Sequence, residues 1–423
     1  MSTTPSAIPE EAAMERAAGE QPRYVARQPI LDARSKVYGY ELLFRAGPTQ
    51  GFSGDGDLAT KTMLDNTMLY GLEKLSGGLP AFVNCTAEAL LGRLVEVLPA
   101  HKTVLEVLET LEPTGELLKA CVALKQKGFR IALDDFVWAP GWEPFLDIAD
   151  FVKVDISICG PHERAALVHR LRGRATHLLA ERVETQVEFE QTRIEGFSLF
   201  QGFYFCHPML IKNREIPTNR MIHLELLRAL LHDPLDHLAL SELVKRDPSL
   251  TYRLLRLVNS PVFGMRNEVR SIQAALGLVG DGLFRRMATV AIASEINGGE
   301  PSELLRMTFQ RGRFCELAAG HVGLNPTEQY LVGILSLLPA LLRAPMDALA
   351  GFMPLREAAL EALLGAHNRE RSTLDWIESY EQGEWERCDR ASDRMGLAPG
   401  VLPGLYADAL QWSEMNLERE HGA

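Results

Sequence analysis

The sequence predicts a closed α/β barrel of the (β/α) type followed by an all-α domain. Three observations carry this prediction. Apolar stretches alternate with helix-like segments between residues 80 and 205, polar side chains follow those stretches, and from Thr218 onward apolar residues recur at helical spacing. Strands that alternate with helices indicate βαβ units and a largely parallel sheet. So many units within about 200 residues suit a closed barrel better than a short open sheet.

Composition limits the class of protein. A chain of 423 residues is too long for one ordinary core, and its 46% hydrophobic and 24% charged residues are typical of soluble globular proteins. The net charge of −12 argues against binding polymeric nucleic acid. The first 21 residues lack a secretory signal, the apolar run at 330–342 is too short to span a membrane, and the six cysteines show no CxxC spacing. We therefore expect a cytoplasmic protein with no membrane contact, no disulfide framework and no zinc site.

The first ordered element is expected to be a hairpin, because residues 24–30 and 37–45 flank the turn-like segment 32–36. Apolar stretches that predict further strands lie at 80–83, 102–108, 129–133, 151–154, 177–180 and 199–205. The segments between them that predict helices lie near 57–76, 86–98, 113–127, 161–172 and 186–195.

Polar residues stand at the ends of the predicted strands: Glu41, Asn84, Glu106, Asp134 with Asp135, Lys153, Glu181 and Gln201. A barrel delivers the carboxyl ends of its parallel strands to one face, so these side chains should converge on one mouth. Each taken singly has a plain alternative as a cap or turn residue. Gathered together, the carboxylates would repel each other without cations. Oxygen ligands suit Mg²⁺, Mn²⁺ or Ca²⁺, and two such ions can promote displacement at phosphorus. Lys153 fits either as a partner of the attacking water or phosphate, or as a simple ion pair.

Eight blocks between residues of about 22 and 210 resemble the EAL domain, in that domain's order. They are Gln28-Pro-Ile30, Glu41-Leu-Leu-Phe-Arg45, Phe82-Val-Asn84, Leu105-Glu-Val-Leu-Glu109, Ala132-Leu-Asp-Asp-Phe136, Val152-Lys-Val-Asp155, Ala180-Glu-Arg-Val-Glu-Thr185 and Gln201-Gly-Phe-Tyr-Phe205. The resemblance implies a TIM-like (β/α) barrel that binds cyclic di-GMP. Active members of the family hydrolyse this nucleotide to the linear dinucleotide with two Mg²⁺ or Mn²⁺ ions.

The resemblance also implies a role for each matched residue. Metal ligands would be Glu41, Asn84, Glu106 and Asp134, with Asp135 reaching the second ion. Lys153 would lie near the attacking water, and Glu181 would act as general base or second-ion ligand. Arg45 would grip a phosphate, Gln201 would lie near the substrate, and Glu109 would brace the loop after Asp135.

The chain departs from the family pattern at three places. The signature reads Glu41-Leu42-Leu43, which keeps the acidic ligand. The glycine-rich loop after the paired aspartates is replaced by Val137-Trp-Ala-Pro-Gly-Trp142, where valine resists the backbone conformations open to glycine. Arg182 replaces a glycine beside Glu181 and could compete with a metal for that carboxylate. We therefore expect the barrel to bind cyclic di-GMP, and leave hydrolysis of the nucleotide open.

The second half resembles the HDOD domain, a relative of HD-type phosphohydrolases that lacks their metal-binding pair. The matching residues are Asp247-Pro-Ser-Leu-Thr-Tyr-Arg-Leu-Leu-Arg-Leu-Val-Asn-Ser-Pro-Val-Phe-Gly264, then Ser271-Ile272 and Val279-Gly280. Where an HD hydrolase has its His-Asp ligands, this chain has Ser336 and Leu337. The literal pair His232-Asp233 precedes Pro234 and is interpreted as a turn.

The resemblances together predict a two-module signalling protein. Its parts are a tail at 1–21, an EAL-like barrel at 22–212, a helical HDOD domain with a C-terminal extension at 213–415, and a tail at 416–423. The barrel would bind cyclic di-GMP, with hydrolysis left open, and the HDOD module would contact a protein partner. Formation of a homodimer is left open. The alternative functions are a silent scaffold that acts only through protein contacts, and action on another phosphodiester.

Overall fold

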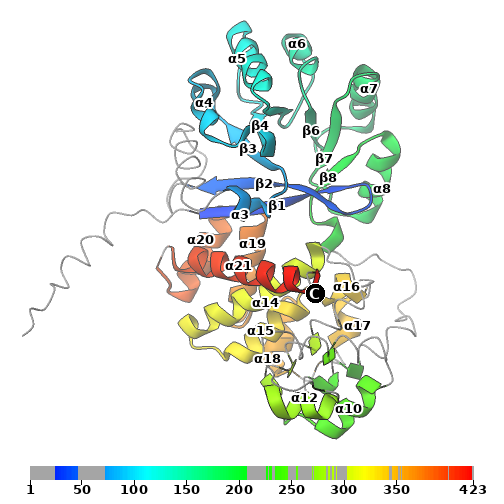
Figure 1. Ribbon diagram of the computed structural model, residues 1–423, viewed down its shortest axis with the longest axis vertical. Coiled ribbons are helices and arrows are strands. Elements are labelled where there is room, and N and C mark those ends of the chain that lie inside the picture. The colour runs from blue at the N-terminus through cyan, green and yellow to red at the C-terminus, as the bar shows by residue number, and fades with distance from the viewer. Residues whose placement is uncertain are drawn as a thin grey trace, which may run out of the picture.

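The computed structural model describes residues 24–45, 72–206, short segments between 225 and 292, and 303–421 with a few short gaps. Within these residues the chain forms a barrel joined to a helical domain (Figure 1). Several sequence predictions lie outside the described residues: the tail at 1–21, most of the helix at 57–76, the pair His232-Asp233 and nearly all of the block 247–264.

Eight strands close the barrel in sequence order, which confirms the predicted fold. The hairpin is confirmed too, because β1 pairs antiparallel with β2, and β1 also closes the barrel antiparallel to β8. All remaining neighbours are parallel. The strands are β1 (Tyr24–Asp32), β2 (Val37–Arg45), β3 (Ala81–Cys85), β4 (Thr103–Val107), β5 (Arg130–Leu133), β6 (Phe151–Asp155), β7 (His177–Glu181) and β8 (Leu199–Gln201).

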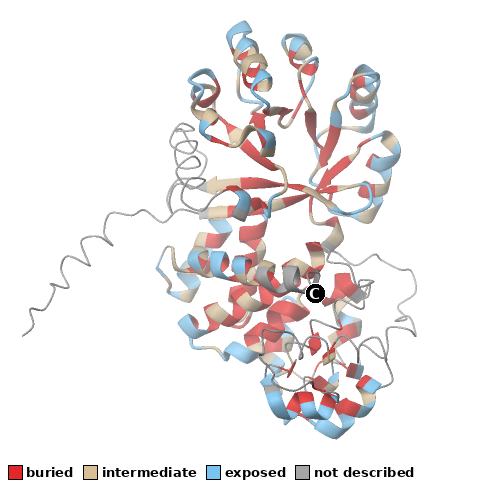
Figure 2. Ribbon diagram, viewed as in Figure 1, coloured by how far each residue is buried: buried red, intermediate tan, exposed pale blue. Residues whose placement is uncertain are grey.

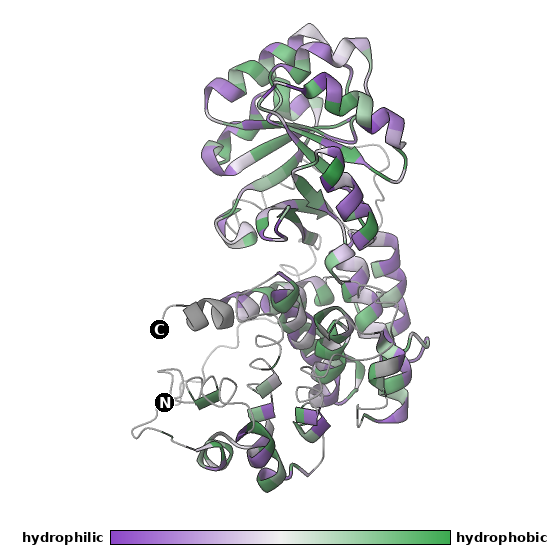
Figure 3. Cartoon of the chain, turned by 90° about the vertical axis from the view of Figure 1, so that its right-hand side faces the viewer, coloured by the Kyte–Doolittle hydropathy of each residue, from purple (hydrophilic) through white to green (hydrophobic). Residues whose placement is uncertain are grey.

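The barrel interior is filled by one apolar layer. Its buried members come from seven strands and form a single cluster: Ile30, Phe82, Val104, Ala132, Phe151, Leu179 and Leu199. Because successive side chains of a strand point to opposite faces, the intervening residues pack outward against the helices. Val83, Leu105 and Phe200 belong to that second cluster. Figure 3 shows the resulting apolar strands inside helices of alternating hydropathy.

Helices follow the strands and cover the outside of the barrel (Figure 1). They begin at residues that supply side-chain caps: Thr114 accepts a hydrogen bond from the Leu117 amide, and Thr185 forms a capping box with Glu188. The short α6 was not predicted from the sequence. The elements are α3 (Leu72–Ser76), α4 (Ala87–Leu91), η1 (Leu94–Val97), η2 (Ala100–Lys102), α5 (Gly115–Gln126), η3 (Pro140–Trp142), α6 (Glu143–Leu146), α7 (Pro161–Leu171), α8 (Gln186–Glu195) and η4 (Tyr204–Cys206).

The described part of the second domain contains helices and no strand, as predicted. Ser271 caps α12 and Gly280 ends it, both as expected from the sequence. The core includes stacked rings of Phe314, Trp376 and Tyr380, and Figure 2 shows the buried central helices. The helices are α10 (His237–Lys245), α12 (Ile272–Val279), α14 (Glu303–Val322), α15 (Pro326–Leu335), α16 (Leu338–Leu342), α17 (Met346–Ala350), α18 (Glu357–Leu363), α19 (Arg371–Glu381), α20 (Trp385–Met395) and α21 (Val401–His421).

The helical domain packs against the β1–β2 hairpin (Figure 1). Ala26 of β1 is part of the helical domain's core, and the Val25 amide donates a hydrogen bond of 3.0 Å to the Tyr380 hydroxyl. Gly383 allows the turn after α19 to approach β2, because a Cβ there would lie 2.8 Å from Leu43 Cδ1. One wall of the barrel is therefore buried by the second domain.

None of the helices in the described ranges has the length and hydropathy required to cross a bilayer.

Gly202, at the end of β8, provides a test of this packing. Its φ is 142°, and a Cβ would lie 2.2 Å from the Val183 carbonyl oxygen. We expect Gly202→Ala to lower the free energy of unfolding by about 2–4 kcal/mol, because steric overlap adds to backbone strain. Urea unfolding measures this. Gly173→Ala is the control, since Gly173 has a φ of 86° but open space around it, and should lose only about 1 kcal/mol. Equal losses would contradict the packing argument.

Candidate active site

The register of the barrel gathers the predicted polar residues into one layer above the apolar one. Except for Glu41 in β2, each lies two positions beyond an interior apolar residue, as Asn84 follows Phe82 and Glu106 follows Val104. Neighbouring strands keep them level, because Asn84 pairs with Glu106 and Gln28 pairs with Glu41 across the sheet. The expected convergence at the carboxyl ends of the strands is confirmed. Direct contacts join six of the side chains: Glu41, Glu106, Asp134, Lys153, Glu181 and Gln201. Asn84 joins them through a hydrogen bond to Glu41.

Lys153 is the centre of this layer. Its Nζ lies 2.7 Å from Glu106 Oε1, 2.7 Å from Asp134 Oδ1, 3.1 Å from Glu181 Oε1 and 3.2 Å from Glu41 Oε2. The lysine side chain is only 1% exposed and that of Glu106 is fully buried. One ammonium group therefore contacts four carboxylates that come from four other segments of the barrel wall.

The ionisation of these groups follows from burial and mutual proximity. Burial lowers the pKa of Lys153, but attraction by Asp134, Glu106, Glu181 and Glu41 outweighs burial and holds the pKa well above its ordinary value. Burial raises the pKa of Glu106, and the Glu41 charge raises it further. Burial also raises the pKa of Glu181, against the pull of Lys153. Lys153 therefore stays positively charged, whereas Glu106 and Glu181 release their protons less readily than exposed carboxyl groups.

This geometry corrects one step of the sequence argument. We expected that only divalent ions could make the gathered carboxylates tolerable, whereas Lys153 supplies an internal cation. The ion-pair interpretation of Lys153 is the one the structure shows. Four carboxylates against one ammonium still leave an excess of negative charge, so the cluster retains a demand for further cations or protons.

Glu41 is held in place by amide side chains. Gln201 Nε2 donates to Glu41 Oε2 at 2.6 Å and to Gln28 Oε1 at 2.7 Å, and Asn84 Nδ2 donates to Glu41 Oε1 at 3.1 Å. The sequence analysis did not single out Gln28. The signal available in the sequence was that Gln28 belongs to a block that resembles the EAL domain. The structure adds that Gln28 lies in β1 opposite Glu41.

The paired aspartates lead into the rebuilt loop. Asp135 has a φ of 40°, a left-handed conformation that aspartate tolerates better than most residues. Burial raises its pKa, and the charges of Asp134 and Asp155 raise it further. After it, Trp142 packs edge-on against Phe136 and Phe145, and Trp138 lies 4.1 Å from the Arg170 guanidinium. The loop is therefore anchored to the outer helices by aromatic contacts in place of glycine flexibility.

Arg182 pairs with a different carboxylate from the one expected. Its Nε lies 3.1 Å from Asp155 Oδ2, and its φ of 56° lies in the left-handed region that glycine adopts without strain. Asp155, at the end of β6, is 4% exposed and also accepts hydrogen bonds from the Ser157 amide and hydroxyl. The sequence analysis overlooked Asp155 as a site residue, although it ends its strand next to Glu181 of β7.

Two further predicted site residues lie at the edge of the site. Arg45 is the last residue of β2, and its side chain lies outside the described residues. Glu109 is exposed on the turn after β4, and its charge raises the pKa of Asp135. The phosphate-binding and bracing roles assigned to them stay predictions.

The donor set is chemically suited to hard divalent ions. Buried oxygens without a hydrogen-bond partner include Asn84 Oδ1, Glu106 Oε2 and Glu181 Oε2. Such acceptors are costly unless a cation or donor meets them. Among the described residues no three His, Cys, Asp or Glu side chains are already arranged as a metal centre. An ion entering this layer would meet these acceptors beside the carboxylate oxygens that Lys153 contacts.

The helical domain shows no comparable cluster at the position of the HD ligands. The Ser336 hydroxyl donates to the Gly333 carbonyl at 2.7 Å and accepts from Arg311, while Leu337 is buried. Arg311 in turn pairs with the buried Glu381. Burial raises the pKa of the nearby Cys315 to about 12, so this thiol stays protonated.

Fold and site together define a class of protein: a (β/α) barrel with a lysine-centred carboxylate layer at its mouth, joined to an all-helical module. Residues 216–348 match the model of the HDOD domain. The chain is 35% identical over 398 residues to "Cyclic di-GMP phosphodiesterase CdgJ" of Vibrio cholerae, covering 92% of each protein. It is 30% identical to "Uncharacterized protein YuxH" of Bacillus subtilis, covering 92% of this chain and 97% of that one.

Among solved structures, the barrel is similar to an EAL domain protein from Listeria monocytogenes. The identity is 21% and the TM-score 0.38, covering 49% of this chain and 96% of the other. The chain belongs to the same family as these two relatives, and its helical part contains an HDOD domain.

The lysine-centred layer predicts a pH-dependent stability. Glu106 and Glu181 have raised pKa values when folded, so they favour folding at low pH and lose that contribution as pH rises through their folded-state pKa values. We expect Lys153→Met to lower the free energy of unfolding by about 3–5 kcal/mol at pH 8, where unpaired carboxylates are buried. The loss should be smaller at pH 5, where the carboxyl groups take up protons. Thermal and urea unfolding across this range measure it.

Lys125→Met is the matched control for this prediction, because Lys125 pairs with Asp150 on the half-exposed barrel surface. Its loss should stay within about 1 kcal/mol and vary little with pH. A Lys153 variant as stable as the Lys125 variant at pH 8 would show that the ammonium does not support the layer.

Proposed function

We propose that the barrel binds cyclic di-GMP together with two divalent ions, Mg²⁺ or Mn²⁺, and hydrolyses it to the linear dinucleotide. The observation that carries the proposal is the buried layer of Glu41, Asn84, Glu106, Asp134 and Glu181, whose oxygens exceed the cations available from the chain. The name of the 35%-identical relative supports this choice of substrate.

Glu41, Asn84, Glu106 and Asp134 would hold one ion, and Asp135 would reach the second. Asp155 would lie near this second position, since its charge raises the pKa of Asp135. Bound ions of this kind polarise a phosphodiester and make hydroxide available near neutral pH. Because the carboxylates must be deprotonated to serve as ligands, ion binding would release protons and weaken as pH falls.

The remaining residues position the reactants. Lys153, a permanent cation, would hold the attacking water or the phosphate by charge and cannot serve as the base. Glu181, with its raised pKa, is better suited to accept the proton of that water. Water oxygen then bonds to phosphorus, one ester oxygen leaves with a proton, and the ring opens. Arg45 and Gln201 would bind the nucleotide, and Glu109 would brace the loop after Asp135.

We further propose that the helical module contacts a protein partner. It matches the HDOD domain, and its Ser336 and Leu337 offer no metal ligands at the position of the hydrolase pair. Homodimerisation through the barrel stays a prediction.

Purified protein with cyclic di-GMP and Mn²⁺ tests the proposal. We expect tight binding by calorimetry and formation of the linear dinucleotide. Glu106→Gln should weaken Mn²⁺ binding at least about tenfold and abolish turnover, because it removes a buried ligand charge. Glu195→Gln is the control, since Glu195 is bonded to Arg164 on the outer helices and should behave as wild type. Binding without product would reduce the proposal to a receptor role. Failure to bind would leave the scaffold alternative.

Arg182 should weaken the second ion position. Arg182→Gly removes a cation near Asp155, and we expect Mn²⁺ to bind about two- to fivefold more tightly, a modest factor because Arg182 is 66% exposed. Folding should not suffer, since glycine adopts positive φ freely. Calorimetric titration measures the affinity, and Arg182→Lys, which keeps the charge, serves as control. Weaker binding by the glycine variant would assign Arg182 a supporting role instead.

A further inference from the structure

The β1–β2 hairpin carries site residues and interface residues side by side. Gln28 and Glu41 face each other across the two strands and belong to the polar layer of the mouth. Their immediate neighbours, Arg27 and Tyr40, contact the helical domain instead. The same two strands therefore form part of the barrel mouth and part of the contact between domains.

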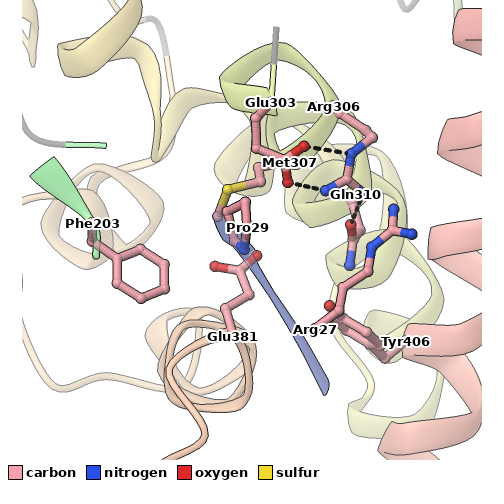
Figure 4. Close-up of a pocket in the computed structure, with 9 residues that line it drawn as sticks. All are labelled: Arg27, Pro29, Phe203, Glu303, Arg306, Met307, Gln310, Glu381 and Tyr406. Carbon is pink, nitrogen blue, oxygen red and sulfur yellow. Dashed lines mark hydrogen bonds and ion pairs between the residues drawn. The ribbon is translucent and has the colours of Figure 1, made fainter. Parts of the chain in front are cut away.

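Tyr40 makes the most direct of these contacts. Its hydroxyl donates a hydrogen bond of 2.9 Å to Glu303 Oε2, at the first residue of α14. Glu303 is itself fixed by ion pairing with Arg306 (Figure 4). The Arg27 and Arg306 guanidinium carbons lie 4.6 Å and 5.3 Å from the centre of the Tyr40 ring. Tyr40 is 4% exposed and Glu303 is 5% exposed, so water does not compete for the hydrogen bond.

Arg27 ties the neighbouring strand to a second helix of the helical domain. Its Nη1 lies 2.7 Å from Glu414 Oε1 of α21 and 2.7 Å from the Leu75 carbonyl of α3. Its Nε and Nη2 atoms are buried without a hydrogen-bond partner beside a small cavity between the domains, which Glu381 and Tyr406 also line (Figure 4). The interface is thus specific at Tyr40 and incompletely packed next to it.

The contact with α14 ties the position of β2 to the helical domain. Glu41 lies one residue from Tyr40 on the same strand, and its carboxylate is already shared among Lys153, Gln201 and Asn84. A small shift of β2 would change those distances, and metal ligands tolerate little displacement. The contact between Tyr40 and α14 therefore links the helical domain to Glu41, a predicted metal ligand.

We propose that Tyr40 is a positioning residue for Glu41: its hydrogen bond to Glu303 fixes β2 at the mouth, so that the helical module sets the affinity of the barrel for divalent ions. The effect on ion affinity rests on the proposed function. By thermodynamic reciprocity, an ion or nucleotide in the mouth alters the same contact and is sensed by α14.

Tyr40→Phe tests the proposal, because it removes the hydroxyl and keeps the ring. Calorimetry with Mn²⁺ alone should show about three- to tenfold weaker binding, the range of ordinary coupling between sites. Hydrogen exchange should quicken in residues 37–44 and remain unchanged in 151–155. Thr373→Val is the matched control: it removes a buried hydrogen bond to Gln329 inside the helical domain, away from the hairpin. That variant should keep the wild-type affinity and hairpin exchange.

Wild-type affinity together with wild-type exchange in Tyr40→Phe would overturn the proposal, and so would an equal loss of affinity in Thr373→Val. The exchange measurement needs neither ion nor nucleotide. If wild type fails to bind Mn²⁺, the proposed function fails. Exchange in the two variants then still decides whether the Tyr40 contact orders the strand that carries Glu41.

Discussion

The ammonium group of Lys153 is the interaction on which the barrel mouth depends. It draws together carboxylates from β2, β4, β7 and the segment after β5, which would otherwise repel one another in a buried layer. One ammonium group does not neutralise four carboxylates. The remaining negative charge would allow the layer to bind further cations. The layer also contains buried oxygens without a hydrogen-bond partner, which are available to further cations.

Much of this could be predicted from the sequence because strand ends and barrel register are local properties. Each interior apolar residue is followed two positions later by a polar one, so Asn84, Glu106 and Glu181 were found from the pattern that also placed their strands. Helix ends were predictable where caps are local, as at Ser271 and Gly280. Site roles rested on the family resemblance, and no contact in the structure assigns them independently.

What could not be predicted depends on contacts between distant residues. No local pattern indicates that Lys153 contacts four carboxylates at once, or that Arg182 pairs with Asp155 in preference to the adjacent Glu181. Gln28 lies in an antiparallel strand, where the polar residue precedes the apolar Ile30, so the rule that works for parallel strands overlooks it. The contact of Tyr40 with Glu303 joins residues 263 positions apart.

The burial of the hairpin by a neighbouring domain has an evolutionary consequence. A self-sufficient barrel can be shuffled between genes, because all its apolar surfaces are covered by its own chain. Here Ala26 is part of the core of the helical domain. Removing the barrel from the chain would leave a gap in that core, and would expose the apolar surface of the hairpin. A substitution in the hairpin at this contact must therefore be compensated by a substitution in the helical domain. We expect the two domains to have been inherited together.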